Sequence, residues 1–234
     1  MKAPIEIIPA VLPKSWDDLE AHVARIPGIT RHVQIDVVDG HFAKGKTWPY
    51  KDGEKFAMVV QQEHGLPHWE ELDFEFDLMI ADPAAEVMKY VHAGASRIII
   101  HAASKTALPA LQQLIDLNED TGAWSVQVGL AVGCQQNLDD LEPFEGQYDF
   151  VQVMGIEHIG KQGEPLSQKA LFMLERLRHR YPNLPLQVDG GVKPENAAAL
   201  VAAGATRLVA GSAIFGSDDA RAAYQALYTV ANAQ

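Results

Sequence analysis

Short apolar runs alternate with amphipathic stretches along the whole chain. Such runs are typical of strands buried on both faces of a parallel sheet, and the amphipathic stretches are typical of the helices that cover it. Strands are expected at residues 5–8, 33–37, 74–80, 97–100, 125–132, 150–154, 186–188 and 208–210. Helices are expected at residues 16–25, 55–63, 84–92, 108–117, 138–143, 167–180, 194–203 and 218–231. Eight strands in alternation with helices predict an α/β protein, a (β/α)8 TIM barrel, with residues 1–234 as one domain.

Two glycine-bearing turns near the C-terminus indicate an anion site. The segments 188–192 (VDGGV) and 209–215 (VAGSAIF) each end a short apolar run in glycine, and a helix is expected between them. Glycine turns at the ends of neighbouring parallel strands expose backbone N–H groups, which are suitable donors for a phosphate dianion. The candidate phosphate-binding residues are Gly190, Gly191, Gly211 and Ser212.

The charge balance limits the partners of the chain. There are 19 basic and 31 acidic residues, giving a formal net charge of −12. Such a charge repels nucleic acid and anionic membrane surfaces, so a phosphate site has to be local and neither partner is expected. The only cysteine, Cys134, excludes an internal disulfide and is interpreted as a small core residue. No run approaches a membrane span, so a cytoplasmic protein is expected.

Three aspartates lie at the ends of otherwise apolar strands, namely Asp36, Asp77 and Asp189. An unpartnered buried carboxylate costs several kcal/mol, so each one needs a metal, a cation or a proton. Gln34 shares the strand face of Asp36 because side chains alternate with a period of two.

Three other acidic residues have a simpler interpretation. Asp39 precedes a glycine and is expected to be a turn residue, while Asp73 and Glu75 are expected at the solvated beginning of a strand.

Several motifs together resemble the ribulose-phosphate 3-epimerase family, in the order and spacing of that family and over nearly the whole chain. They are Ile8-Pro9, residues 34–42 (QIDVVDGHF), Phe76-Asp77-Leu78-Met79, Ala93-Gly94-Ala95, Val128-Gly129-Leu130-Ala131, Val153-Met154, and the two segments 188–192 and 209–215. The resemblance implies a barrel of the ribulose-phosphate-binding type. It also implies binding of a phosphorylated ketopentose and inversion of its C3 carbon through an enediolate.

The resemblance also assigns roles to residues. It makes Asp36 and Asp189 the opposed acid and base, with a divalent metal beside them. It places Met79, Met154 and Gly160 among the residues that line the substrate, with packing at a strand end as the alternative for the two methionines. The phosphate then lies on the two glycine turns described above.

Departures from the family pattern affect the metal site. The family has histidine ligands at the positions of Gln34 and Asp77, and serine at the position of Ala10. The remaining candidate ligands are Gln34, Asp36, Asp77 and Asp189. These oxygen donors suit Mg²⁺ or Mn²⁺ better than Zn²⁺. The alternative is that no metal binds and that one of the converging carboxyl groups is protonated.

Two loops also depart from the family pattern. The segment 157–163 contains Lys161, which is either a phosphate contact or an exposed loop residue. The longer segment 41–55 is either a lid or a contact between subunits of a homo-oligomer, which is the expected assembly. His41 and His158 are the histidines expected nearest the barrel mouth, and neither has a partner visible in the sequence.

Three functions remain open. The first is an isomerase that acts on a phosphorylated ketose such as ribulose 5-phosphate. The second is a phosphosugar lyase or decarboxylase of the same barrel group. Such relatives usually carry a lysine on the third strand, and the absence of one at residues 75–80 (EFDLMI) counts against this function. The third is a protein that binds a phosphosugar without catalysis, favoured by the missing histidines and opposed by the intact Asp36 and Asp189.

Overall fold

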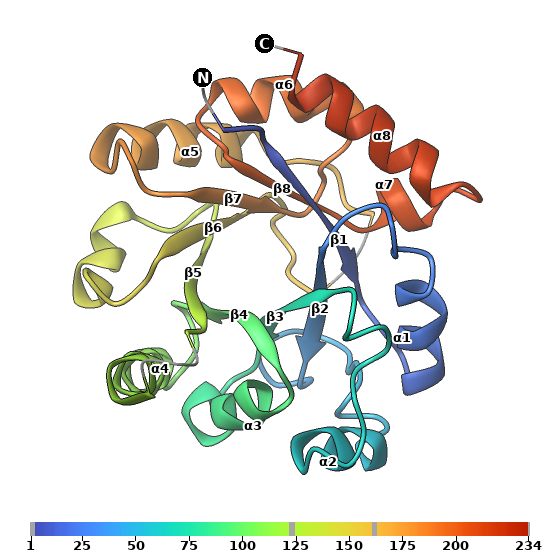
Figure 1. Cartoon of the computed structure of the whole chain (residues 1–234). Coiled ribbons are helices and arrows are strands. Elements are labelled where there is room, and N and C mark those ends of the chain that lie inside the picture. The colour runs from blue at the N-terminus through green and yellow to red at the C-terminus, as the bar shows by residue number, and fades with distance from the viewer. Residues whose placement is uncertain (1–2, 122–124, 161–162, 234) are drawn as a thin grey trace.

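The computed structural model describes residues 3–121, 125–160 and 163–233, and its strands form a closed parallel barrel (Figure 1). Each strand pairs with the next one in sequence, and β8 pairs with β1. The strands are β1 (Glu6–Val11), β2 (His32–Val38), β3 (Asp73–Met79), β4 (Ala95–His101), β5 (Gln127–Gly133), β6 (Phe150–Met154), β7 (Leu186–Asp189) and β8 (Arg207–Ala210). The predicted (β/α)8 barrel is therefore confirmed.

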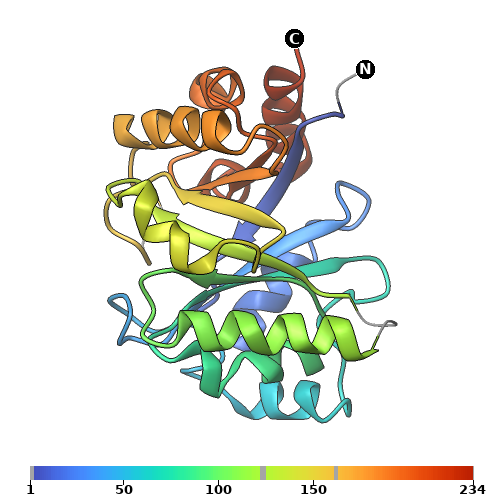
Figure 2. The same ribbon diagram turned by 90° about the vertical axis from the view of Figure 1, so that its left-hand side faces the viewer.

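Helices surround the barrel on its outer side, and both chain ends lie at the same end of the molecule (Figures 1 and 2). The α-helices are α1 (Trp16–Val23), α2 (Glu54–Val60), α3 (Val87–His92), α4 (Ala107–Thr121), α5 (Gln168–Arg180), α6 (Pro194–Ala202), α7 (Ser212–Phe215) and α8 (Ala220–Ala231). Two 3₁₀ segments, η1 (Pro83–Ala85) and η2 (Leu138–Phe144), complete the set. None of the helices in the described part of the chain combines the length and the apolar character that a membrane crossing needs.

Two helical segments differ from the sequence-based expectation. The segment expected as a helix at 138–143 is the 3₁₀ segment η2, and Pro143 inside it lacks the N–H group that an α-helix would require. The short helix α7, which follows Gly211 directly, was not expected. It matters for the site because its first N–H groups lie at the barrel mouth and precede the first intrahelical hydrogen bond.

The main hydrophobic core lies between the barrel and the helices. Residues such as Ile35, Phe76 and Leu78 point outward from the strands and join helix residues such as Leu174 and Leu200 in one large cluster. The interior of the barrel holds two small apolar clusters, one around Ile99 and Phe150 and one around Ile8 and Val209. The rest of the interior is polar, because the alternate residues of β2, β3, β6 and β7 carry amide or carboxyl groups.

Candidate active site

A pocket opens at the C-terminal ends of the strands, where (β/α)8 barrels carry their functional residues. It brings together residues that are far apart in the sequence, and it includes both glycine turns. The predicted residues that line it are Asp36, Met79, Met154, Gly160, Asp189, Gly190, Gly191, Gly211 and Ser212. Ala10 lines it as well. The pocket therefore contains all the predicted substrate-lining and phosphate-binding residues.

Glycine is required by the geometry of the first turn. Gly190 and Gly191 have φ angles of 102° and 71°, in the left-handed region that side chains disfavour. A Cβ atom on Gly191 would lie 2.5 Å from the backbone nitrogen of Leu166, and one on Gly190 would lie 2.9 Å from Ile156. The backbone of this turn is thus exposed toward the pocket because no side chain can occupy the turn.

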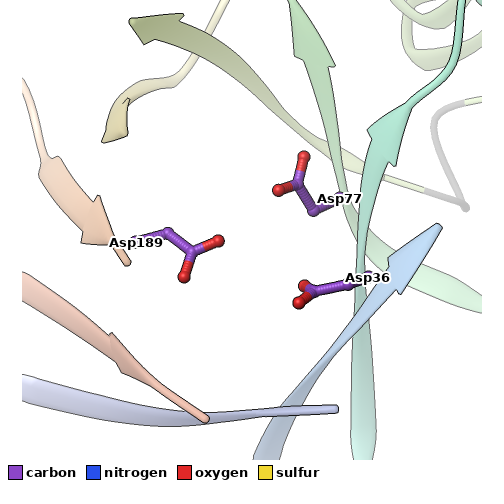
Figure 3. Close-up of side chains that lie close together, drawn as sticks. All are labelled: Asp36, Asp77 and Asp189. Atoms are coloured by element: carbon purple, nitrogen blue, oxygen red, sulfur yellow. The ribbon is translucent and has the colours of Figure 1, made fainter. Parts of the chain in front are cut away.

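Three carboxyl groups converge inside the barrel mouth (Figure 3). Asp36 and Asp77 are direct neighbours in the register of β2 and β3, and Asp189 faces them from β7. One oxygen of each group lies within 4.8 Å of the others, and all three residues are buried. The predicted convergence of Asp36, Asp77 and Asp189 therefore occurs in the structure.

The electrostatic environment of this cluster favours protonated carboxyl groups. Burial, together with the negative charges of Asp189 and Asp77, raises the pKa of Asp36 well above its ordinary value. Burial and the charge of Asp77 likewise raise the pKa of Asp189, to about 8. Hydrogen bonds from Gln34 oppose both shifts. A carboxyl group with a raised pKa can keep a proton at a pH where an ordinary aspartate has lost it, as general acid catalysis requires.

Each carboxyl group also receives a hydrogen bond from a buried neighbour. The Gln34 amide nitrogen donates to Asp36 at 2.7 Å and to Asp189 at 3.0 Å. Asp77 lies 2.8 Å from Nε2 of His101 and accepts from the Gln152 amide at 3.1 Å. His101 and Gln152 were missed by sequence reasoning, although both occupy alternate interior positions of apolar strands, which was the available signal.

The donor set fits a hard divalent cation. Three buried carboxylates within 4.8 Å of one another carry up to three negative charges, and their hydrogen bonds within the described part of the chain come from amide and imidazole groups. Oxygen donors of this kind suit Mg²⁺ or Mn²⁺, and none of the three is a soft ligand. Gln34 was the fourth predicted ligand. Its amide nitrogen, and not its oxygen, faces the carboxylates, so in this orientation Gln34 offers no oxygen to a metal.

The predictions for the other acidic residues had mixed outcomes. Asp39 is a turn residue as expected, since its carboxylate accepts from the backbone N–H groups of His41, Phe42 and Ala81. Although burial opposes it, these hydrogen bonds lower the pKa of Asp39. The expectation for Glu75 was wrong because it is fully buried, where its carboxylate lies 3.5 Å from Arg97.

The structure places three of the loop features that the sequence singled out, namely His41, His158 and the segment 41–55. Lys161 lies outside the described residues, so its role stays a prediction. His158 is exposed and lies 3.3 Å from Glu164, while His41 lines a second hollow beside Phe42 and Lys105. In the segment 41–55, Trp48 is fully buried, and the backbone N–H of Thr47 donates to the carbonyl of Val38, so this part is attached to the end of β2.

Comparisons with known proteins agree with this architecture. The model of the ribulose-phosphate 3 epimerase family matches residues 6–215. The chain is 29% identical to the ribulose-phosphate 3-epimerase of Aquifex aeolicus over 221 residues, covering 92% of each chain. It is 27% identical to the enzyme of the same name from Bacillus subtilis over 225 residues, covering 94% of this chain and 96% of that one.

Solved structures add evidence on the fold. The 3-hexulose-6-phosphate synthase of Salmonella typhimurium aligns with a TM-score of 0.70 at 14% identity, covering 97% of this chain and 98% of that one. KGPDC from Streptococcus mutans aligns with a TM-score of 0.70 at 12% identity, covering 98% of each chain. At such low identity these likenesses show the barrel alone. The family match, by contrast, runs from the start of β1 to the end of α7, and we conclude that the chain belongs to the ribulose-phosphate 3-epimerase family.

Proposed function

We propose that the protein is an isomerase that epimerises a phosphorylated ketose at the carbon beside the carbonyl, with ribulose 5-phosphate as the first substrate to test. The observation that carries the proposal is the position of Asp36 and Asp189 in one pocket with the two glycine turns. The turns supply backbone donors for the phosphate, and the two carboxyl groups come from β2 and β7, on different sides of the mouth. A planar intermediate held between them presents one face to each group.

The proposed reaction needs one carboxylate and one carboxylic acid at a time. The ionised aspartate takes the C3 proton of the ketose, which leaves an enediolate and a neutral carboxyl group. The other aspartate, protonated at the start, gives its proton to the opposite face of C3 and becomes ionised. The two groups have then exchanged roles, and the next turnover runs in the other direction or after proton exchange with water. Raised pKa values for both groups support this proton sharing.

A divalent metal is part of the proposal, with Asp36, Asp77 and Asp189 as the residues that would hold it. When bound, Mg²⁺ or Mn²⁺ would supply positive charge beside the developing oxyanion. The residues of the chain do the remaining work. Gln34 holds Asp36 and Asp189 in place, His101 and Gln152 orient Asp77, and the glycine turns hold the phosphate.

The decisive experiment follows the C3 proton of ribulose 5-phosphate by NMR in D₂O, with and without added Mn²⁺. Exchange of that proton with solvent, together with formation of the C3 epimer, is the expected result. A lyase or decarboxylase would cleave a carbon–carbon bond instead, and no lysine lies among the described residues of the pocket lining. Binding of the sugar phosphate with no exchange under any condition would contradict the isomerase and favour a binding protein.

A further inference from the structure

Three glutamine side chains lie in contact inside the barrel, directly below the three aspartates. They are Gln34 on β2, Gln152 on β6 and Gln187 on β7, and all three are fully buried. The amide nitrogen of Gln187 lies 2.8 Å from Oε1 of Gln152 and 3.4 Å from Oε1 of Gln34. The same nitrogen lies 2.7 Å from the carboxylate of Glu75. Gln187 is therefore the residue where the glutamines join.

Glu75, which contacts Gln187 on the side away from the barrel mouth, determines the direction of these hydrogen bonds. The guanidinium of Arg97 lies 3.5 Å from the Glu75 carboxylate, and its positive charge stabilises the ionised form. A carboxylate can only accept, so Gln187 points its NH₂ group at Glu75. In this orientation the Oε1 atom of Gln187 is buried and has no hydrogen-bond partner among the described residues. An unpaired buried acceptor is destabilising, so the orientation is kept in spite of a cost.

The orientation of Gln187 affects the other two glutamines, which contact both Gln187 and the aspartates. The two N–H groups of Gln187 have their nearest acceptors in Glu75 at 2.7 Å and Gln152 at 2.8 Å, so the Gln34 oxygen at 3.4 Å can only share one of them. Gln152 and Gln34 both turn their carbonyl oxygens toward this nitrogen and their NH₂ groups toward the aspartates. Gln34 then donates to both Asp36 and Asp189, and Gln152 donates to Asp77. Turning Gln34 over would place its oxygen beside two carboxylates and its NH₂ group against that of Gln187.

We infer that Gln187 is a positioning residue that fixes the side-chain amides of Gln34 and Gln152 with their donors toward the aspartates. Gln34 thereby bridges the two acid–base groups as a donor and is withheld as an oxygen ligand of a metal. The orientation of the amides stands on the contacts alone, whereas its consequence for turnover rests on the proposed isomerase function. Gln187 itself is not among the residues that line the pocket.

The orientation itself is tested by neutron diffraction from crystals of the metal-free wild-type protein exchanged into D₂O. We expect deuterons on the Gln34 atom that faces Asp36 and Asp189, and on the Gln187 atom that faces Glu75. A carbonyl oxygen of Gln34 facing the two aspartates would overturn the inference. This readout needs neither substrate nor turnover, so it is independent of the proposed function.

The effect of the Gln187 hydrogen bonds is tested with Gln187→Leu, which removes the donor and leaves a slightly shorter apolar side chain. Freed from Gln187, the Gln34 oxygen can turn toward the aspartates, so Mn²⁺ affinity measured by EPR titration is expected to rise about tenfold, a change of roughly 1.4 kcal/mol. The kcat for the proposed reaction is expected to fall about tenfold with KM nearly unchanged, because the glycine turns are not altered. Unchanged Mn²⁺ affinity in a folded variant would contradict the inference.

A second variant reverses the direction of the hydrogen bonds at position 187 instead of removing them. The exchange Glu75→Gln with Gln187→Glu keeps the charge and the volume but places an acceptor under Gln34 and Gln152, so a similar rise in Mn²⁺ affinity is expected. The control is Gln127→Leu at an exposed position of β5, since Gln127 accepts from Arg97 at 3.2 Å and lies outside the hydrogen bonds that join the three glutamines. If the control changes Mn²⁺ affinity as much as the two variants do, the effect is structural and the inference fails.

Discussion

The interior of the barrel has two ends that treat carboxyl groups in opposite ways. At the lower end, Glu6 contacts Arg97, Arg207 and His32 at 3.1, 3.2 and 2.8 Å. Although burial works against it, His32 and the two arginines lower the pKa of Glu6 to about 2. At the mouth, Asp36 and Asp189 have amide donors but no cation among the described residues, and burial with the repulsion of neighbouring carboxylates raises both pKa values.

The difference shows which end is built for stability and which for chemistry. Glu6, which is paired with three cationic or imidazole groups, has a lowered pKa, as expected for an acid in a structural cluster. Acids held close together without a cation are poised to bind a proton or a metal, which is costly for folding and useful for catalysis. The mouth is therefore the end of the barrel whose carboxyl groups have the raised pKa values that proton transfer needs.

The largest expected effect is on turnover. Asp189→Asn removes one of the two proton-transfer groups, and turnover should fall by about 10²–10⁴-fold. Affinity for the sugar phosphate should be nearly unchanged, because the proposed phosphate contacts are backbone amides of the glycine turns. Steady-state kinetics on the proposed substrate and calorimetric binding measure the two quantities. A variant that loses only affinity would show that Asp189 binds the substrate without transferring protons.

The lower end should respond through stability. Arg97→Met leaves Glu75 and Glu6 without their shared cation, and breaking a buried ion pair costs about 3–5 kcal/mol. Urea unfolding of both proteins gives the difference. Arg31→Met is the control, since Arg31 pairs with Asp73 at the surface and such pairs contribute at most about 1 kcal/mol. Equal losses in the two variants would remove the distinction between a buried and an exposed pair.

A smaller effect concerns metal selectivity at the mouth. Gln34→His combined with Asp77→His replaces one amide and one carboxylate by imidazoles, and Zn²⁺ affinity is expected to rise about tenfold relative to Mn²⁺. The wild-type protein, purified without chelator, should contain little zinc by elemental analysis. Stoichiometric zinc bound by the wild-type cluster would show that three carboxylates suffice for a softer metal.

The smallest expected effect is a pH dependence of stability. The pKa of Asp189 is raised from 3.8 to about 8, so between these values the folded state keeps a proton that the unfolded state has released. Stability from this group is therefore present below about pH 4 and lost as the pH rises to 8. Relative to wild type, Asp189→Asn should raise Tm at pH 8 by about 2–4 °C, the scale of 1 kcal/mol, with no gain at pH 4. An equal shift at both pH values would contradict the assigned pKa.

Much of this could be predicted from the sequence, and the missing part has a definite cause. The strands, the glycine turns and the three aspartates follow from patterns within short segments. The contact of Gln152 with Asp77 joins β6 to β3 across the interior, and no local pattern shows which residues meet there. Glu75 was misplaced for a related reason. Its burial depends on Arg97, its neighbour in the register of β4, and the sequence alone does not show that pairing.

The location of the main hydrophobic core outside the sheet has a consequence for how such a protein changes over time. Most of the buried apolar side chains that stabilise the folded state lie between the strands and the helices. The interior of the barrel holds only two small apolar clusters among the described residues. Exchanges among the luminal amides and acids thus leave the greater part of the packing untouched. Natural or laboratory selection can therefore change the reaction through single substitutions of inward-facing residues while the fold is retained.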